Sequence, residues 1–329
     1  MKFLLALLIL ALPVPDSKID KIFRGWNRGP GGSVGVVVDG RLVFARGYGL
    51  ADVAKKTPNT PQTVYDLASV SKQFTATAVL LQAQRGKLAL TDRLDKHISG
   101  LPAYAAGTSL ERLLTMTSGF PEYDDSQPVK LEDLRETLRS EPGTLKAEYQ
   151  YLNMNYALLT FVVQKVAGQP LGEVLQQDIF RPLKMGHTTF LHSKSQRVEK
   201  RAIGYKRHKG GWVVSRNDVP GVGDGNVFSS VEDLSLWAID WLHGSSLLKP
   251  EWQRRAWTRA AQDIDYGFGF EIDEHQGQRR ISHSGSWNGT STYIALYPQR
   301  KLAVIVLSNR EEEDSYGLGE QVEDLFLRS

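Results

Sequence analysis

Ser69 and Lys72 are the two residues whose types and spacing best suit covalent chemistry. They stand three residues apart at the start of a predicted helix, which places both side chains on one face, one turn apart. A serine hydroxyl is a weak nucleophile until a base removes its proton, and a lysine can be that base when burial and the positive end of a helix favour its neutral amine. The helix start also presents free backbone N–H groups that can stabilise an oxyanion. The pair therefore predicts a nucleophile, a base and part of an oxyanion hole within one short segment.

The helix that carries this pair is predicted to run from Ser71 to Arg85. Helix-forming residues dominate it, and Gly86 is predicted to end it in the left-handed conformation. An apolar stripe at helical periodicity indicates that the helix is buried, and it consists of Phe74, Ala78 and Leu81.

The Ser-x-x-Lys pattern alone is a weak signal, because about one match is expected by chance in a chain of this length. A second copy occurs at Ser246 and Lys249, between Gly244 and Pro250. Glycine and proline at these places predict a loop between helices, so we interpret the second copy as chance.

Tyr151 and Asn153 lie at the entrance to a helix predicted over residues 153–167. A tyrosine phenol beside a lysine ammonium has a lowered pKa, so Tyr151 could pass protons between nucleophile and leaving group. The amide of Asn153 could hold either a substrate carbonyl or the lysine. The alternative is structural: Asn153 caps the helix and Tyr151 packs on the core.

His283, Ser284 and Gly285 come at the end of a strand predicted over residues 279–283. A strand edge can donate a backbone N–H to an acyl oxygen, and a glycine lets the substrate approach closely. The alternative is a turn at the strand end that carries an exposed histidine.

Other polar residues give no sign of a metal site. The histidines include no His-Glu-x-x-His pair, and His187 and His192 have no acidic or cysteine partners, so no metal is predicted. We interpret Asp124, Asp125 and the acidic run 311–314 as solvated loops.

Composition indicates an ordinary globular chain of 329 residues, with 41% hydrophobic and 23% charged residues. The net charge of +3, without any run of lysine or arginine, argues against a nucleic-acid partner. The absence of cysteine excludes disulfides, thiolate metal sites and a cysteine nucleophile. We predict no cofactor, and the expected partner is a small-molecule or peptide substrate.

The N-terminus is typical of an export signal. Lys2 is followed by the apolar stretch 3–12, which is too short to span a bilayer. We therefore predict a signal peptide over residues 1–15, a secreted or periplasmic protein, and no stable membrane span after signal removal. Pro13 and Pro15 leave the cleavage site unclear, and an uncleaved anchor or a mistranslated start are the alternatives.

Hairpins are predicted at both ends of the chain, with helices between them. The Asp39-Gly40 pair is a strong hairpin signal between strands predicted over 33–38 and 41–48. Further strands are predicted over residues 266–272, 279–283, 292–297 and 302–307. Helices are predicted over residues 19–28, 109–116, 131–138, 153–167, 171–180, 231–243 and 316–327.

This order of elements predicts an α+β fold. Its antiparallel sheet is built from both chain ends and flanked by helices, and its central subdomain is mostly helical. We expect one catalytic domain over residues 16–329, with a sheet part at about 19–66 and 260–329 and a helical part at about 67–259.

Taken in order, the three motifs resemble those of the serine β-lactamase and penicillin-binding-protein superfamily. The resemblance is greatest to its class C-like branch of β-lactamase-related esterases, D-alanyl-D-alanine carboxypeptidases and D-aminopeptidases. Residues 69–72 (Ser-Val-Ser-Lys) resemble the nucleophile motif, residues 151–153 (Tyr-Leu-Asn) resemble the Tyr-x-Asn motif, and residues 283–285 (His-Ser-Gly) occupy the place of the Lys-Thr-Gly motif. Further similar stretches are residues 113–121, 225–234 and 306–309.

The resemblance implies a β-lactamase/transpeptidase-like fold and an acyl-enzyme on Ser69. It implies that Lys72 and Tyr151 act as general bases or acids and that the Ser69 and Ser286 amides form the oxyanion hole. It also implies that substrate is bound by Asn153, His283, Ser284 and Gly285.

One departure from the family pattern bears on the substrate. Class C β-lactamases usually carry a lysine where this chain has His283, and that lysine helps to bind the substrate carboxylate. The departure favours an esterase or D-amino-acid peptidase over a β-lactamase.

The sequence therefore predicts a monomeric serine hydrolase that acts through an acyl-enzyme on an ester or peptide bond. A β-lactamase is the alternative within this class, and a penicillin-binding sensor with little turnover is the alternative from a different class. Whether Lys72 or Tyr151 is the main base stays open at this point.

Overall fold

The computed structural model describes residues 14–141, 143–144, 146, 148–219 and 221–328. The predicted signal peptide therefore lies outside the described residues except for Val14 and Pro15, which directly precede the first helix.

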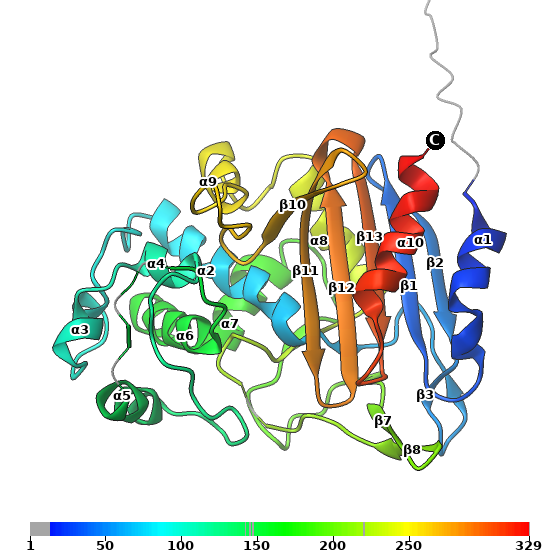
Figure 1. Cartoon of the computed structure of the whole chain (residues 1–329), viewed down its shortest axis with the longest axis horizontal. Coiled ribbons are helices and arrows are strands. Elements are labelled where there is room, and N and C mark those ends of the chain that lie inside the picture. The colour runs from blue at the N-terminus through cyan, green and yellow to red at the C-terminus, as the bar shows by residue number, and fades with distance from the viewer. Residues whose placement is uncertain (1–13, 142, 145, 147, 220, 329) are drawn as a thin grey trace, which may run out of the picture.

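A six-stranded antiparallel sheet with the order β10-β11-β12-β13-β1-β2 organises the fold (Figure 1). The two chain ends meet inside this sheet, because β13 pairs with β1 along its whole length. The predicted α+β class, with a sheet built from both ends, is thus confirmed. The strands are β1 (Gly32–Val38), β2 (Arg41–Tyr48), β10 (Glu271–His275), β11 (Gln278–Trp287), β12 (Thr290–Tyr297) and β13 (Leu302–Ser308).

Helices cover both faces of the sheet and form a separate region beside β11 (Figure 1). The covering helices are α1 (Asp16–Ile22), α8 (Val231–Leu242) and α10 (Ser315–Leu327). The neighbouring region contains α2 (Lys72–Gln84), α3 (Ala103–Ala106), α4 (Leu110–Leu114), α5 (Leu131–Ser140), α6 (Asn153–Ala167), α7 (Leu171–Leu175) and α9 (Pro250–Ala256).

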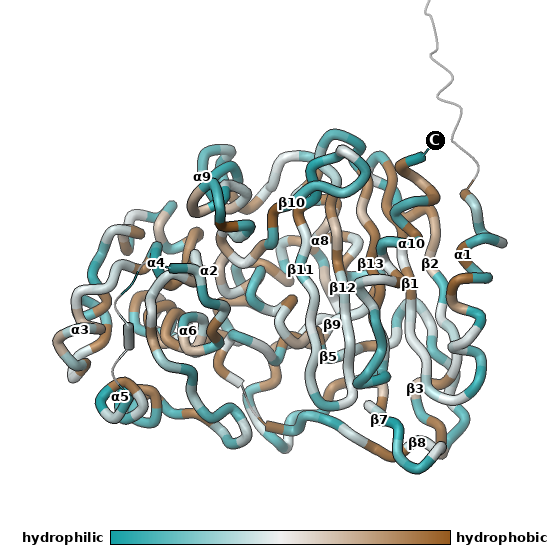
Figure 2. The backbone as a smooth tube through the Cα atoms, viewed as in Figure 1, coloured by the Kyte–Doolittle hydropathy of each residue, from teal (hydrophilic) through white to brown (hydrophobic). Residues whose placement is uncertain are grey.

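The central strands are apolar on both faces because both faces are covered. Successive side chains of a strand point to opposite sides of the sheet. In β1, Val34 and Val36 pack with side chains of α1 and α10, whereas Val37 belongs to the larger core that includes α8. Strand β13 therefore reads as a continuous apolar run in the sequence, and Figure 2 shows much of it in brown.

Helix α2 runs through the middle of the larger core. Every residue from Lys72 to Ala83 is buried, as expected for a helix that neighbours contact on all sides. Gly86 follows it with φ of +70°, so the predicted left-handed stop is confirmed. The helix places Lys72, its first residue, between the sheet and the helical region.

Three smaller sheets are formed by the described residues, and the sequence did not indicate them. They pair β5 (Tyr65–Asp66) with β9 (Val227–Ser229) and β6 (Thr189–Phe190), β3 (Leu50–Asp52) with β4 (Thr57–Pro58), and β7 (Tyr205–His208) with β8 (Gly211–Val214). Strand β5 matters for function because the chain passes directly from it to Ser69.

The strand predicted over residues 266–272 is wrong at its start, since β10 begins only at Glu271. Gly269 instead lies closely over the start of helix α2, and Gly267 lies against the Ala256 carbonyl at the end of α9. A Cβ atom on Gly269, whose φ is +79°, would come within 2.8 Å of the Lys72 carbonyl oxygen. The glycines in this aromatic stretch thus serve a close backbone contact.

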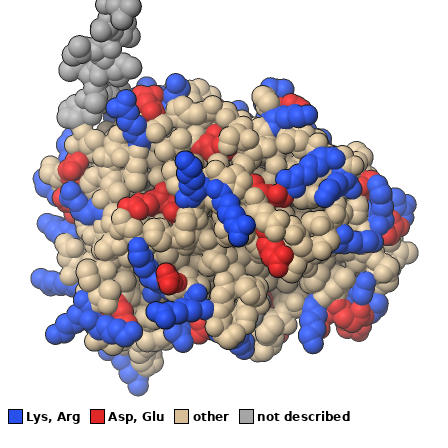
Figure 3. Space-filling view, turned by 180° about the vertical axis from the view of Figure 1, so that it is seen from behind, with Lys and Arg blue, Asp and Glu red and all other residues tan. Residues whose placement is uncertain are grey.

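The surface carries mixed charge. On the face seen in Figure 3, lysine and arginine side chains are interspersed with aspartate and glutamate. In the described part of the chain, no helix is both long and apolar enough to cross a membrane.

Candidate active site

Ser69 lies in a 3-10 turn, Ala68–Ser71, that leads directly into α2. The turn begins with a strained residue, because Ala68 has a φ of +46°. Two threonines of β12 hold the preceding backbone: Thr290 Oγ1 donates to the Asp66 carbonyl and Thr292 Oγ1 to the Leu67 carbonyl, both at 2.8 Å. Strand β12 of the sheet therefore fixes the backbone that leads into the nucleophile turn.

Lys72 holds its amine against Ser69 through three contacts. Its Nζ atom lies 3.0 Å from Ser69 Oγ, 2.8 Å from Asn153 Oδ1 and 2.8 Å from the Asp224 carbonyl oxygen. The last two groups can only accept hydrogen bonds, so they occupy two N–H groups of the amine. In the neutral lysine, the remaining lone pair is then directed at the Ser69 hydroxyl.

The loop that carries the Asp224 carbonyl is itself fixed by two buried threonines. Thr75, one turn after Lys72 on α2, donates to the Gly223 carbonyl, and Thr160 of α6 donates to the Val222 carbonyl, both at 2.6 Å. Gly223 has a φ of +68°, and a Cβ atom there would lie 2.3 Å from Thr160 Oγ1. The acceptor for the lysine is therefore positioned by packing between two helices.

Burial favours the neutral amine of Lys72, the form that can accept a proton. The side chain is 0% exposed, and desolvation lowers its pKa from the ordinary 10.5 to about 8. The negative charges of Asp224, Glu122 and Asp125 raise the pKa but do not cancel this effect. At pH 7 about one tenth of such a lysine is neutral, compared with less than about a thousandth for an exposed lysine. The predicted proximity and burial of the pair are thus present in the structure.

Asn153 is the first residue of α6, and it is not the cap of that helix. The Glu122 carboxylate accepts the backbone N–H groups of Asn153 and Met154 at 2.7 and 2.9 Å, which satisfies the positive end of the helix. The Asn153 side chain is thereby free to bind Lys72. Sequence reasoning missed Glu122, which follows the family-like stretch 113–121 directly.

Tyr151 lies beside this pair, but its pKa shifts in the direction opposite to our prediction. Desolvation raises the pKa of the phenol above its ordinary value of 10, and only the hydrogen bond with Ser69 acts against this. Lys72 Nζ lies over the ring face, 5.0 Å from the ring centroid, and so does not act directly on the phenolic oxygen. The phenol is protonated at neutral pH, and the side chain is 37% exposed at the edge of the site.

His283 is a buried residue within β11, and this corrects both of our predictions for its position. The ring is 1% exposed; Nδ1 donates to the Ser284 carbonyl at 2.6 Å, which leaves Nε2 to accept from the Tyr266 hydroxyl at 3.1 Å. With both nitrogens bonded, the ring has no free face for substrate. It instead packs between Tyr266 and Tyr151, with ring centroids 5.8 and 6.0 Å away.

The buried imidazole should make folding sensitive to acid. Burial, with the Lys72 charge nearby, lowers the pKa of His283 from 6.5 to about 3. The unfolded chain gains this proton below about pH 6.5 while the folded chain does not, so stability from this group is complete above that pH and is lost as the pH falls towards 3. The free energy of unfolding should fall as the pH is lowered from about 6.5 towards 3. We expect His283→Gln to make this fall smaller by about 1 kcal/mol per pH unit.

Urea unfolding between about pH 7 and pH 4 measures this difference. The matched control is His208→Gln, since His208 lies exposed on β7. The slope should be unchanged by the control. The titration of other groups cancels in this comparison because all variants share it. Plots of unfolding free energy against pH that run parallel for the wild type and His283→Gln would contradict the lowered pKa of His283.

Gly285 brings β11 into direct contact with the nucleophile turn. A Cβ atom at this position would lie 2.4 Å from the Leu67 carbonyl oxygen and 3.1 Å from the Ser69 nitrogen, so only glycine fits. Ser284 is half-buried and Ser286 exposed on either side of it. The predicted second oxyanion amide, that of Ser286, thus belongs to the strand that runs beside Ser69.

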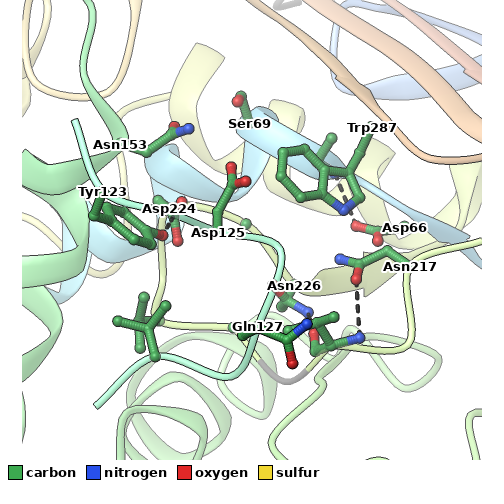
Figure 4. Close-up of a pocket in the computed structure, with 16 residues that line it drawn as sticks. Asp66, Ser69, Tyr123, Asp125, Gln127, Asn153, Asn217, Asp224, Asn226 and Trp287 are labelled. Atoms are coloured by element: carbon green, nitrogen blue, oxygen red, sulfur yellow. Dashed lines mark hydrogen bonds between the residues drawn. The ribbon is translucent and has the colours of Figure 1, made fainter. Parts of the chain in front are cut away.

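A cavity with about 40 Å³ of free volume, partly open to solvent, lies next to Ser69 (Figure 4). Of the site residues predicted from sequence, Ser69 and Asn153 line it. Its other polar lining residues were not predicted as a site: Asp66, Tyr123, Asp125, Gln127, Asn217, Asp224, Asn226 and Trp287.

Two of these residues illustrate what the sequence could signal. Asp125, interpreted as solvated, is half-buried in the cavity wall. Asp224 accepts the Tyr123 hydroxyl at 2.8 Å and stands between Gly223 and Gly225, a glycine pair that could have signalled a tight loop. Within the described ranges, no group of three or more histidine, aspartate or glutamate side chains is arranged to hold a metal ion.

Comparisons with known proteins agree with this geometry. A profile of the beta-lactamase family matches residues 19–325. Protein flp of Staphylococcus aureus is 30% identical over 311 residues, which cover 86% of this chain and 60% of that protein, so the chain spans about three fifths of this relative.

Solved structures superimpose over nearly the whole chain. The octameric penicillin-binding protein homologue from Pyrococcus abyssi has a TM-score of 0.85 at 26% identity, covering 95% of this chain and 77% of that one. The D-amino acid amidase from Ochrobactrum anthropi has a TM-score of 0.84 at 20% identity, covering 95% and 99%, and so shares the fold. The expected monomer stays a prediction.

The profile match over most of the chain, joined to the Ser69–Lys72 arrangement at the start of a buried helix, assigns the protein: it belongs to the beta-lactamase family of serine hydrolases.

Proposed function

We propose that this protein cleaves ester or amide bonds through an acyl-enzyme on Ser69. The observation that carries the proposal is the contact of 3.0 Å between Lys72 Nζ and Ser69 Oγ, with the amine held by two further acceptors. A lysine held in this way needs no rearrangement to take the serine proton.

In the first step, neutral Lys72 accepts the Ser69 proton while Oγ attacks the substrate carbonyl carbon. The carbonyl oxygen becomes an oxyanion, which the backbone N–H groups of Ser69 and Ser286 stabilise. The bond to the leaving group then breaks, the leaving alcohol or amine takes a proton from Tyr151 while the Lys72 ammonium returns one to the phenol, and an ester on Ser69 remains. Water attacks this ester, its proton returns through Lys72, and the acid is released.

The raised pKa of Tyr151 suits a proton donor better than a base. A phenol that stays protonated at neutral pH can protonate the leaving group, while Lys72, with its pKa of about 8, accepts the serine proton. We therefore propose Lys72 as the main base. His283 acts as a positioning residue that fixes Tyr266 and the ring of Tyr151.

The test is intact-mass spectrometry of the protein after exposure to a fluorophosphonate and, separately, to a penicillin. We expect one fluorophosphonate adduct that maps to Ser69, because this reagent requires only an activated serine. No adduct with either reagent would overturn the proposal. A stable penicillin adduct without release would instead support a penicillin-binding sensor.

Efficient β-lactam turnover is not expected. The lysine that class C enzymes use for the substrate carboxylate is replaced here by a buried, neutral histidine. Rapid release of hydrolysed penicillin in the same experiment would contradict this part of the proposal and favour a β-lactamase.

A further inference from the structure

A short hairpin at the end of the molecule away from the helical region carries a cluster of cations. Strands β7 and β8 form a two-stranded sheet of their own, which lies beside β3 at the lower edge of the fold in Figure 1. Lys206, Arg207 and Lys209 are exposed on β7 and in the turn that follows it. We did not predict a basic cluster from the sequence, because His208 interrupts this run.

Arg28 lies beside the hairpin because of a close backbone contact. Trp212 of β8 packs on Gly29, where a Cβ atom would lie 2.7 Å from the indole nitrogen. The exposed Arg28 directly precedes this glycine. A cation that is distant in the sequence thus joins the cations of β7.

Lys56 approaches the hairpin from the turn between β3 and β4. The Tyr205 hydroxyl accepts the Val53 N–H of this turn at 2.9 Å, and Lys56 is exposed at the end of the same turn. We call the surface formed by the following cations the basic patch: Arg28, Lys56, Lys206, Arg207 and Lys209. In Figure 3, blue side chains gather at the lower left, where the turned view places β7 and β8.

The basic patch keeps an excess of positive charge. Within the described ranges, none of its five cations forms an ion pair with a carboxylate. The neighbouring Lys55, Arg216 and Arg310, in contrast, are each paired with one. Glu311 and Glu312, which follow β13, are acidic residues near the hairpin without a cationic partner. The unpaired cations of the patch outnumber these two carboxylates, so the surface attracts anions.

Two exposed valines lie among these cations. In the register of the hairpin, Val213 is opposite Lys206 and Val214 is opposite Tyr205. The two valines are 38% and 59% exposed, and Val214 is the most exposed large hydrophobic residue in the part of the chain that the structure describes. Cations next to exposed apolar side chains match the surface of an anionic membrane, where cations meet lipid phosphates and apolar side chains enter the acyl boundary.

We propose that the β7–β8 hairpin binds the protein to membrane surfaces that contain anionic phospholipids. This inference goes beyond the hydrolase function and does not rest on it, because no residue of the basic patch lines the cavity beside Ser69. The long stems of the lysines allow their ammonium groups to reach lipid phosphates while Val213 and Val214 leave water. A soluble polyanion would satisfy the same charges but would leave the valines in water.

Sedimentation with lipid vesicles tests the contribution of charge. We expect the full chain to bind vesicles of phosphatidylcholine with about one third phosphatidylglycerol at least tenfold more tightly than vesicles of phosphatidylcholine alone, because each cation near an anionic surface adds to the affinity. Lys206→Gln combined with Lys209→Gln should weaken binding to the anionic vesicles by about tenfold or more. The apolar N-terminal stretch is the same in every variant, so it does not contribute to the difference.

The matched control is Lys87→Gln combined with Lys130→Gln. These two lysines are exposed in the helical region, after α2 and before α5, and their replacement changes the net charge by the same amount. The control should bind both kinds of vesicle like the wild type. Equal weakening by the hairpin variant and the control would show that only net charge matters and would overturn the proposed binding surface.

A fluorescent label tests whether the hairpin reaches the bilayer itself. The chain has no cysteine, so a polarity-sensitive dye can be attached to a single introduced cysteine. The dye on Val214→Cys should brighten and shift to the blue with the anionic vesicles and stay unchanged with soluble polyphosphate, because only a bilayer removes it from water. The same dye on Leu236→Cys, which is 36% exposed on α8, should not respond.

A dye at position 214 that does not respond to anionic vesicles would overturn the inference. A response to polyphosphate equal to that with vesicles would also overturn it, in favour of a soluble polyanion. Fluorophosphonate labelling of Ser69 should be the same in all these variants. Failure of the proposed function would appear in that labelling, and failure of this inference only in the vesicle measurements.

Discussion

Replacing Ser69 with alanine is expected to abolish acylation and to lower kcat/KM by about 10⁴-fold or more, because no other described group near the carbonyl site can form the covalent intermediate. The variant should keep its fold, since the Ser69 side chain is bonded within the catalytic group and the turn is held by backbone contacts to Thr290 and Thr292. Intact mass after fluorophosphonate exposure and steady-state hydrolysis of a neutral ester measure the two effects.

The chain supplies its own control for this experiment. Ser246 belongs to the second Ser-x-x-Lys copy, lies exposed between α8 and α9, and bonds to Asp240. Ser246→Ala should label and turn over substrate like the wild type. If Ser69→Ala retained a fluorophosphonate adduct or turnover near the wild-type level, the nucleophile would have to lie elsewhere.

Replacing Lys72 with arginine is expected to lower kcat/KM by about 10²- to 10⁴-fold, the usual contribution of a general base. Arginine keeps the positive charge but does not lose its proton in the accessible pH range, so it cannot take the serine proton. In the wild type, kcat/KM should rise with pH and level off above about 8, where Lys72 becomes neutral. This acid limb should disappear from the residual activity of Lys72→Arg.

A charge change beside the lysine tests the same assignment without removing it. Asn153→Asp places a carboxylate where Nζ now has an amide oxygen at 2.8 Å, which favours the ammonium and should move the acid limb above pH 8. Lys249→Arg, in the second Ser-x-x-Lys copy, should leave both rate and profile unchanged. An acid limb that Asn153→Asp does not move would mean that another group sets it.

Local signals in the sequence predicted the elements that carry the nucleophile. Asp39 and Gly40 both adopt positive φ in the turn between β1 and β2, as the Asp-Gly pair predicts. Gly86 and Gly168 end α2 and α6 in the left-handed conformation, as a glycine after a periodic helical pattern predicts. These features depend on neighbouring residues alone, so one sequence suffices to find them.

The cavity beside Ser69 depends on contacts that no local sequence pattern records. Asp66, Asp125 and Asp224 come from three separate loops or strand ends, and only the packing of the helical region against the sheet brings them together. The pKa of Tyr151 was mispredicted for the same reason: the sequence suggested a nearby cation but not the desolvation that raises this pKa. The aromatic stretch before Glu271 has the composition of a strand, yet Gly269 serves its passage over α2 and Gly267 serves a close contact with the Ala256 carbonyl at the end of α9.

The hydrogen bonds from β12 to the nucleophile turn mean that the active site can form only late during synthesis of the chain. Thr290 and the Asp66 carbonyl that it binds are 224 residues apart in the chain. Ser69 and Lys72 therefore leave the ribosome long before the strand that fixes them, and closing so long a loop is a late and slow event in folding. A nascent chain that has not yet completed β12 and β13 should thus be unreactive towards fluorophosphonate, so that the final hairpin acts as a built-in delay on the enzyme.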